Sequence, residues 1–127
     1  MWREFNNNPV GKKTGDCAVR AISVALGISW DDAHYMLSEL SRAMGETLAA
    51  DDVWGAVLRQ HGFYRSATPN SCPDCYTAAD FAQDHPHGTF VRGFGGHCAT
   101  VIDGVILDAW NSSNEVPVYV WYRKDGG

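Results

Sequence analysis

The sequence of 127 residues lacks an excess of positive charge, long apolar runs and internal repeats. Ten lysine and arginine residues stand against 15 aspartates and glutamates, and the formal charge of −5 argues against the basic surface of a nucleic-acid-binding protein. No apolar run approaches the roughly 20 residues that a membrane-spanning helix needs. No signal-peptide pattern is visible either. We therefore expect a cytoplasmic protein that binds neither nucleic acid nor membrane.

Cysteines are few, four in the whole chain. In a cytoplasmic protein such residues are reduced thiols or metal ligands far more often than disulfides. The composition is otherwise that of a globular protein, with 45% apolar residues, and the length suits one compact domain. No linker divides the chain, so we expect a single domain over residues 1–127.

Helical signals dominate the first half of the chain. A nearly all-apolar run predicts a short buried helix over residues 17–26, followed by a glycine suited to end it. Apolar residues at helical spacing predict further helices from Ser29 to about residue 45 and over residues 51–60. A capping-box pattern at Thr77 predicts a fourth, short helix that ends before Pro86.

Short β segments separated by turns fill the last third of the chain, in the stretches GTFVRGF, GGHCATVI, GVILDAW and PVYVWYR. Asp103 and Gly104 form a strong two-residue hairpin signal between the second and third stretches. Helices followed by strands predict an α+β fold. We expect helices within residues 1–62 to pack on an antiparallel sheet within residues 88–124, with a loop and a short helix over residues 63–87.

Cys17 stands at the first turn of the expected buried helix, directly after Gly15 and Asp16. Backbone N–H groups and the helix dipole favour a thiolate at this position. Buried structural cysteines are common, so the position alone does not identify a nucleophile. Arg20 follows one turn later on the same face. It could lower the pKa of the thiol, bind substrate or form a buried ion pair.

The expected hairpin brings a histidine and an aspartate together. Its turn pairs Ile102 with Val105, and strand alternation then places His97 and Asp108 on one face as diagonal neighbours. A carboxylate that holds an imidazole orients a general base and fixes its tautomer. Trp110 shares this face, where it could shield the pair from water or simply pack.

A cysteine at a helix start, a strand histidine and a carboxylate on the next strand follow the chain order of papain-like cysteine peptidases. The stretch NNNPVGKKTGDCAVRAISVALGISWDDAHYML resembles the nucleophile region of small papain-like peptidases of phages and bacteria, and GTFVRGFGGHCATVIDGVILDAWNSS resembles their histidine and aspartate strands. The resemblance implies Cys17 as nucleophile, His97 as general acid and base, and Asp108 as the orienting residue. Papain has asparagine in the third role, but Asn111 falls on the opposite face from His97.

The chain departs from the family at the oxyanion hole. Papain-like enzymes commonly carry a glutamine six residues before the nucleophile, where this chain has Gly11. The backbone N–H of Cys17 could supply one oxyanion donor, and the side chain of Asn6 or Asn8 another. Turn formation is the simpler explanation for both asparagines.

A possible metal site lies outside this set. Cys72 and Cys75 form a C-x-x-C turn, and His85 and His87 follow it. Two cysteines and two histidines can hold a zinc ion, but this histidine spacing is unlike that of the usual structural sites and such patterns often arise by chance. We expect surface thiols, without a metal or another cofactor.

These features together predict a cysteine-dependent hydrolase of amide or peptide bonds that acts on a protein or peptide through a thioester acyl-enzyme. One alternative is a papain-like module that binds a partner protein with weak or no turnover. Another is a glutamine deamidase or transglutaminase-like acyl transferase with the same Cys–His–Asp chemistry. A third is an interaction protein stapled by zinc at Cys72 and Cys75.

Overall fold

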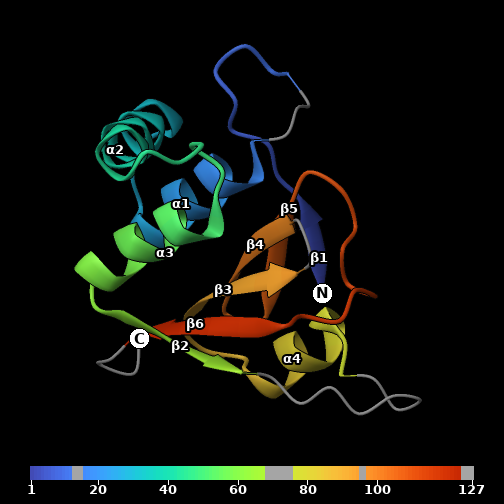
Figure 1. Cartoon of the computed structure of the whole chain (residues 1–127). Helices are drawn as coiled ribbons and strands as arrows, with labels where there is room; N and C mark the ends of the chain where they lie inside the picture. Colours follow the sequence, from blue (N-terminus) through green and yellow to red (C-terminus); the bar gives the residue numbers. More distant parts are fainter. Residues whose placement is uncertain (13–15, 68–75, 95–96, 124–127) are drawn as a thin grey trace.

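A sheet of six strands forms the centre of the fold, with helices on both of its faces (Figure 1). The structure, a computed structural model, describes residues 1–12, 16–67, 76–94 and 97–123. Its elements follow in the order β1 (Trp2–Glu4), α1 (Cys17–Leu26), α2 (Trp30–Met44), α3 (Asp51–Gln60), β2 (Phe63–Ala67), α4 (Ala78–Asp84), β3 (Thr89–Phe94), β4 (His97–Ile102), β5 (Val105–Asp108) and β6 (Tyr119–Arg123). The fold is therefore α+β, as the order of helical and strand signals predicts.

The sheet is mixed rather than wholly antiparallel. Its strand order is β1-β5-β4-β3-β6-β2. All neighbouring pairs are antiparallel except β1 and β5, which run parallel with Trp2 opposite Ile106 and Glu4 opposite Asp108. The prediction of an antiparallel sheet is therefore wrong at this edge. Three residues are too few to show the alternation that reveals a strand, and only pairing with distant β5 defines them as one.

β2 is a second strand that the sequence pattern did not predict, since residues 63–87 were expected to hold only a loop and a short helix. It pairs antiparallel with β6 at the other edge of the sheet. Phe63 is buried whereas Tyr64 is 46% exposed, as alternation requires. The remaining residues, Arg65, Ser66 and Ala67, add no large apolar side chain, so the local signal for a strand is weak.

The four predicted helices are confirmed, and their ends follow from local hydrogen bonds. α1 covers residues 17–26, as expected, and a left-handed glycine follows it. The side chain of Ser29 accepts a hydrogen bond from the backbone N–H of Asp32 (3.0 Å) and so begins α2. Thr77 and Asp80 cap α4 reciprocally, which is the capping box that the sequence indicates.

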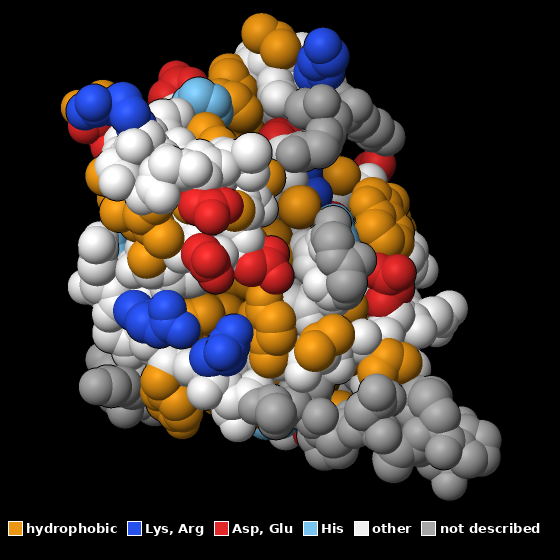
Figure 2. All heavy atoms as spheres, viewed as in Figure 1, with side chains coloured by type: hydrophobic (Ala, Val, Ile, Leu, Met, Phe, Trp, Pro, Cys, Tyr) orange, Lys and Arg blue, Asp and Glu red, His pale blue; other side chains and the backbone are white. Residues whose placement is uncertain are grey.

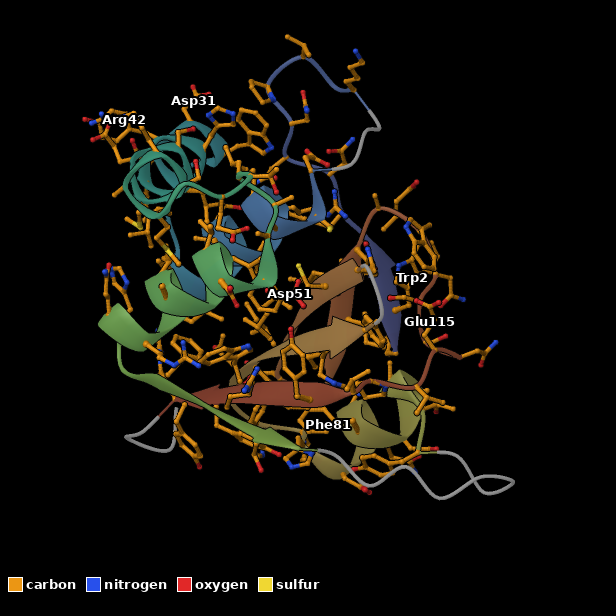
Figure 3. All side chains as sticks on the ribbon, viewed as in Figure 1. Trp2, Asp31, Arg42, Asp51, Phe81 and Glu115 are labelled. Carbon is orange, nitrogen blue, oxygen red and sulfur yellow. The ribbon has the colours of Figure 1, made fainter. Side chains whose placement is uncertain are left out.

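Alternating side chains of the sheet build two apolar layers. Cys98 packs with Ile22 of α1 in the layer shared with α2 and α3, whereas Val101 packs with Phe81 in the layer under α4. Figure 3 shows the two sides, with Asp51 of α3 above the sheet and Phe81 of α4 below it. The first turn of α1 consequently lies on the Cys98 side of β4.

The hairpin between β4 and β5 has the predicted register. Ile102 is opposite Val105, and the pairing continues through Val101 with Ile106. The turn residues Asp103 and Gly104 have φ values of 49° and 78°, the left-handed backbone that a two-residue turn requires. This register brings the start of β4 next to the end of β5, where the candidate site lies.

Among the described residues, no helix is both long and apolar enough to cross a membrane. On the face that Figure 2 presents, the basic side chains stand in separate small groups among acidic and apolar ones.

Candidate active site

Cys17 is the first residue of α1, and its side chain is partly exposed. Asp16 precedes it at the N-cap position, but its carboxylate makes no capping hydrogen bond to the helix. α1 lies against β4, which brings the thiol of Cys17 to the side chains of His97 and Cys98. The nucleophile candidate and the first residues of β4 thus meet at one end of the sheet.

The surroundings of Cys17 favour a thiolate. A hydrogen bond with the Cys98 thiol is the largest influence, and with the backbone of Cys98 and the ring of His97 it outweighs the opposing effect of burial. Together they lower the pKa of the Cys17 thiol from its ordinary 9.0 to about 4. The buried Cys98 shows the reverse, since its hydrogen bond to Cys17 and its burial raise the pKa of its own thiol. Cys17 is therefore the thiolate of the two.

The His97 ring contacts one carboxylate and two aromatic rings. Its Nε2 lies 2.7 Å from Oδ2 of Asp108. The rings of Phe94 and Trp110 pack against it, with centroids 5.8 and 4.7 Å away. Burial alone would lower the pKa of His97, but hydrogen bonds with Asp108 and Cys17 overcome it and raise the pKa from 6.5 to about 9. The imidazole is therefore charged at neutral pH.

Asp108 ends β5 and is completely buried. Burial works against its charge, but hydrogen bonds from His97, Ser112 and the backbone N–H of Ala109 prevail, so the pKa of its carboxyl is lowered. The edge strand β1 lies beside its backbone, with Glu4 opposite Asp108, and the next residue, Phe5, donates its N–H to the carbonyl of Asp108 (2.8 Å). The unpredicted strand thus helps to hold the predicted carboxylate.

Arg20 forms a buried ion pair, one of the three roles that its position in the sequence allowed. Its side chain is 5% exposed and bridges two carboxylates, with Nη1 2.8 Å from Asp16 and Nη2 3.1 Å from Asp108. Asp16 also accepts a hydrogen bond from Nε1 of Trp30 (3.0 Å). The buried guanidinium therefore directs both of its Nη atoms to carboxylates of the protein.

Asn6 and Asn8 make the turn hydrogen bonds that were the simpler explanation for them. Asn6 donates to the carbonyl of Lys12 (3.2 Å), and the side-chain oxygen of Asn8 accepts from the backbone N–H of Val10 (3.0 Å). Asn8 also donates to Asp16 (3.4 Å). The hydrogen bonds of the two asparagines among the described residues link neither of them to Cys17.

Trp110 and Asn111 follow Asp108 along the chain. Trp110 is 47% exposed and tilts over the ring of His97, so its packing covers part of that ring from solvent. The side-chain oxygen of Asn111 accepts from the backbone N–H of Ser113 (3.1 Å), a local turn bond. Asp108, and not Asn111, is the residue that contacts His97.

The possible zinc ligands are only partly described. Cys72 and Cys75 lie outside the described residues. His85 stacks on Phe81, with ring centroids 3.9 Å apart, and His87 is exposed. Among the residues that the structure describes, no group of three or more histidine, cysteine or acidic side chains is placed to hold a metal ion.

Cys98, Asp16 and Ser112 are site residues that the sequence did not reveal as such. Cys98 follows His97 in β4, so strand alternation turns it to the opposite face, where it is buried. The sequence did not indicate that α1 packs on that same face, which is why the contact of Cys98 with Cys17 was not expected. Asp16 and Arg20 at helical i, i+4 spacing were a usable signal for an ion pair, whereas nothing near Ser112 indicates that its hydroxyl donates to Asp108 (2.7 Å).

Replacing Cys98 with alanine is expected to raise the pKa of the Cys17 thiol above about 4, because it removes the strongest influence on the thiolate. Cys98→Ser keeps a donor at the same place and should keep the pKa low. The measurement is the rate of iodoacetamide reaction at Cys17 against pH, mapped by mass spectrometry. Identical profiles for the alanine and serine variants would contradict a donor role for Cys98.

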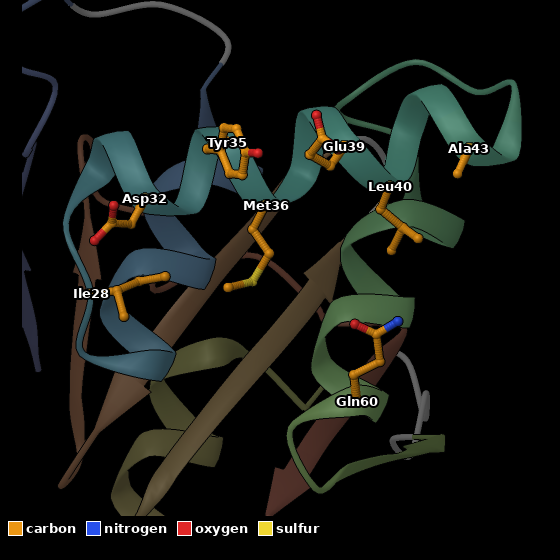
Figure 4. A pocket seen from close by; sticks show the side chains of 8 residues that line it. All are labelled: Ile28, Asp32, Tyr35, Met36, Glu39, Leu40, Ala43 and Gln60. Atoms are coloured by element: carbon orange, nitrogen blue, oxygen red, sulfur yellow. The ribbon is translucent and has the colours of Figure 1, made fainter.

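An apolar groove of about 570 Å³ lies beside α2 (Figure 4). Ile28, Met36 and Leu40 contribute its apolar lining, and Tyr35 at its rim is 68% exposed. Glu39 adds a negative charge. None of its described lining residues belongs to the cluster around Cys17, so the groove is a separate surface feature.

The cluster around Cys17 combines segments that are far apart in the chain. α1 contributes the thiolate, the start of β4 the imidazolium and the end of β5 the buried carboxylate. In such an arrangement the thiolate can attack an electrophilic carbon, and the imidazolium beside it can give a proton to the leaving group.

Comparisons of the chain with models of protein families, with curated proteins and with solved structures found no match.

Proposed function

We propose that the chain is a papain-like, cysteine-dependent hydrolase that cleaves amide or peptide bonds in a protein or peptide substrate. One observation carries the proposal: the His97 imidazole, whose Nε2 lies 2.7 Å from Oδ2 of the buried Asp108 carboxylate, also lowers the pKa of the Cys17 thiol. The chain order of these residues and the segments around them resemble papain-like peptidases, which supports the same assignment.

The proposed reaction begins with the Cys17 thiolate, which attacks the carbonyl carbon of the amide. The backbone N–H of Cys17 can donate to the oxyanion that forms. The imidazolium of His97 then protonates the leaving amine, and a thioester to Cys17 remains. Neutral His97 takes a proton from water, which attacks the thioester and releases the acid. Thiolate and imidazolium are restored.

Several features of the site suit these steps. Nε2 of His97 is bonded to Asp108, so Nδ1 is the nitrogen left to exchange protons with Cys17 and the leaving group. Asp108 is buried and its pKa is lowered, which keeps it charged beside the imidazolium. The rings of Phe94 and Trp110 both pack against the imidazole. The imidazole therefore has little freedom to rotate away.

The test is capture of an acyl-enzyme from a mixed peptide library, with acid quenching and mass spectrometry of the Cys17 peptide. We expect a thioester on Cys17 and hydrolysed peptides, both lost in Cys17→Ala by at least about 10³-fold. Cys98→Ser is the matched cysteine control and should keep the adduct. A folded wild-type protein that forms no adduct and cleaves no peptide would overturn the proposal.

The same experiment distinguishes a peptidase from an acyl transferase and from a glutamine deamidase. Added primary amines would appear in the products of an acyl transferase, and conversion of glutamine to glutamate would mark a deamidase. Hydrolysis of main-chain peptide bonds marks a peptidase.

A second candidate function is binding of a partner protein with little turnover. The apolar groove beside α2 favours it, because Tyr35 is 68% exposed at its rim and the groove lies apart from Cys17. A binding function requires that Cys17→Ala keeps the partner, whereas Tyr35→Ser loses it.

A further inference from the structure

Each oxygen of the Asp108 carboxylate accepts two hydrogen bonds. Oδ1 accepts from Arg20 (3.1 Å) and from the backbone N–H of Ala109 (2.8 Å). Oδ2 accepts from His97 (2.7 Å) and Ser112 (2.7 Å). A carboxylate offers about four lone-pair sites, so this group is saturated. Rotation about its Cβ–Cγ bond would break all four hydrogen bonds at once.

Arg20 is the only charged donor to Oδ1 among the described residues, and it is itself fixed. Its Nη1 lies 2.8 Å from Oδ1 of Asp16, whose other oxygen accepts from Trp30 (3.0 Å). The side chains of Arg20 and Asp16 are each 5% exposed. A planar guanidinium held at one end by a buried carboxylate presents its other end in a defined direction.

Five side chains around the site form a line of alternating charge. Asp16, Arg20, Asp108, His97 and Cys17 follow one another through contacts at each step, and the two ends of the line are neighbours in sequence. The inner ion pair and the candidate catalytic pair therefore share one carboxylate. Any change that loosens Arg20 is transmitted to His97 through Asp108.

We propose that Arg20, held by Asp16, is a positioning residue that fixes the Asp108 carboxylate so that Oδ2 remains directed at His97. The proposal rests on the proposed function, since positioning matters only if His97 exchanges protons with Cys17. It assigns to Arg20 a role in the reaction without contact to substrate.

Losing the charge of Arg20 and losing the fixed position of Asp108 would change the pKa of His97 in opposite directions, which makes the proposal testable. Arg20 is a positive charge near the imidazolium, so loss of its charge alone would raise the pKa of His97. Loss of the fixed Asp108 oxygen would weaken the hydrogen bond to Nε2 and lower the pKa of His97 from about 9 toward its ordinary 6.5. The charged groups in this network are Asp108 and Cys17, which act on His97 directly, and Arg20, which contacts Asp108.

The experiment is an NMR titration of the histidine ring protons, with the His97 signals identified by their absence in His97→Gln. Arg20→Met removes the guanidinium, and Arg20→Lys keeps the charge without the planar fork. Arg42→Met, at an exposed position of α2, is the matched control. We expect both Arg20 variants to lower the pKa of His97 by at least about one unit, a tenfold change in its proton affinity.

An unchanged or raised pKa of His97 in folded Arg20→Met would overturn the proposal. If that variant does not fold, Arg20→Lys decides, because its charge is unaltered and only a change in geometry can move the titration. The titration needs no substrate. A lowered pKa in a protein that cleaves no amide would therefore support the positioning role and count against the proposed hydrolase.

Discussion

Replacing His97 with glutamine is expected to abolish amide cleavage and to raise the pKa of the Cys17 thiol above about 4. The imidazolium both donates to the thiolate and supplies an opposite charge beside it, and glutamine supplies no charge. The Cys98 thiol remains as a donor, so the pKa should stop short of its ordinary 9.0. At about pH 6, a rise of about three pKa units would cut the thiolate fraction, and with it the alkylation rate, by at least about tenfold.

The measurement is the iodoacetamide rate at each cysteine against pH in the wild type and in His97→Gln. In the wild type, Cys17 should become reactive as the pH rises through about 4. Amide cleavage should follow a bell, with Cys17 deprotonated above about 4 and His97 protonated below about 9. His34→Gln, on an exposed face of α2, is the matched control. Cys17 reactivity in His97→Gln that equals the wild type would show that the imidazolium does not support the thiolate.

Replacing Asp108 with alanine is expected to lower the free energy of unfolding by about 3–5 kcal/mol, the usual result of removing one partner from a buried ion pair. The change leaves Arg20 with only Asp16 to balance it and leaves Nε2 of His97 without its carboxylate. The hydroxyl of Ser112 also loses its acceptor. Asp108→Asn keeps the shape and one side-chain acceptor, so its cost should be smaller.

Urea unfolding at several pH values measures this effect. The pKa of Asp108 is lowered in the folded protein, so its stabilisation is fully present above the ordinary value of 3.8 and is lost as the pH falls through the lower folded value. The difference between wild type and Asp108→Ala should therefore shrink on acidification. Asp31→Ala, at an exposed position of α2, should cost less than about 1 kcal/mol. An equally small cost for Asp108→Ala at neutral pH would contradict a structural role for the ion pair.

Local signals in the sequence predict most of the elements that position the site. Capping residues such as Ser29 define the helices, because a cap acts on the backbone next to it. The two-residue turn at Asp103 and Gly104 determines the hairpin register, and that register alone brings His97 toward Asp108. Both inferences use only neighbouring residues or strict alternation.

The features that the sequence did not reveal depend on contacts between distant segments. β1 is a strand only because β5 pairs with it, and the role of Cys98 depends on which face of β4 carries α1. The choice among three roles for Arg20 needed the position of Asp108 in space. Periodicity states which face a side chain takes but not which element covers that face.

The order of the site residues along the chain bears on how the protein is made. During synthesis from the N-terminus, Cys17 emerges long before the residues that make its thiol acidic, which begin at His97. Until β4 has been translated and has packed against α1, Cys17 has neither of the side chains that lower the pKa of its thiol. The growing chain therefore carries an ordinary thiol, and its reactivity appears only after the strand that contains His97 and Cys98 has left the ribosome.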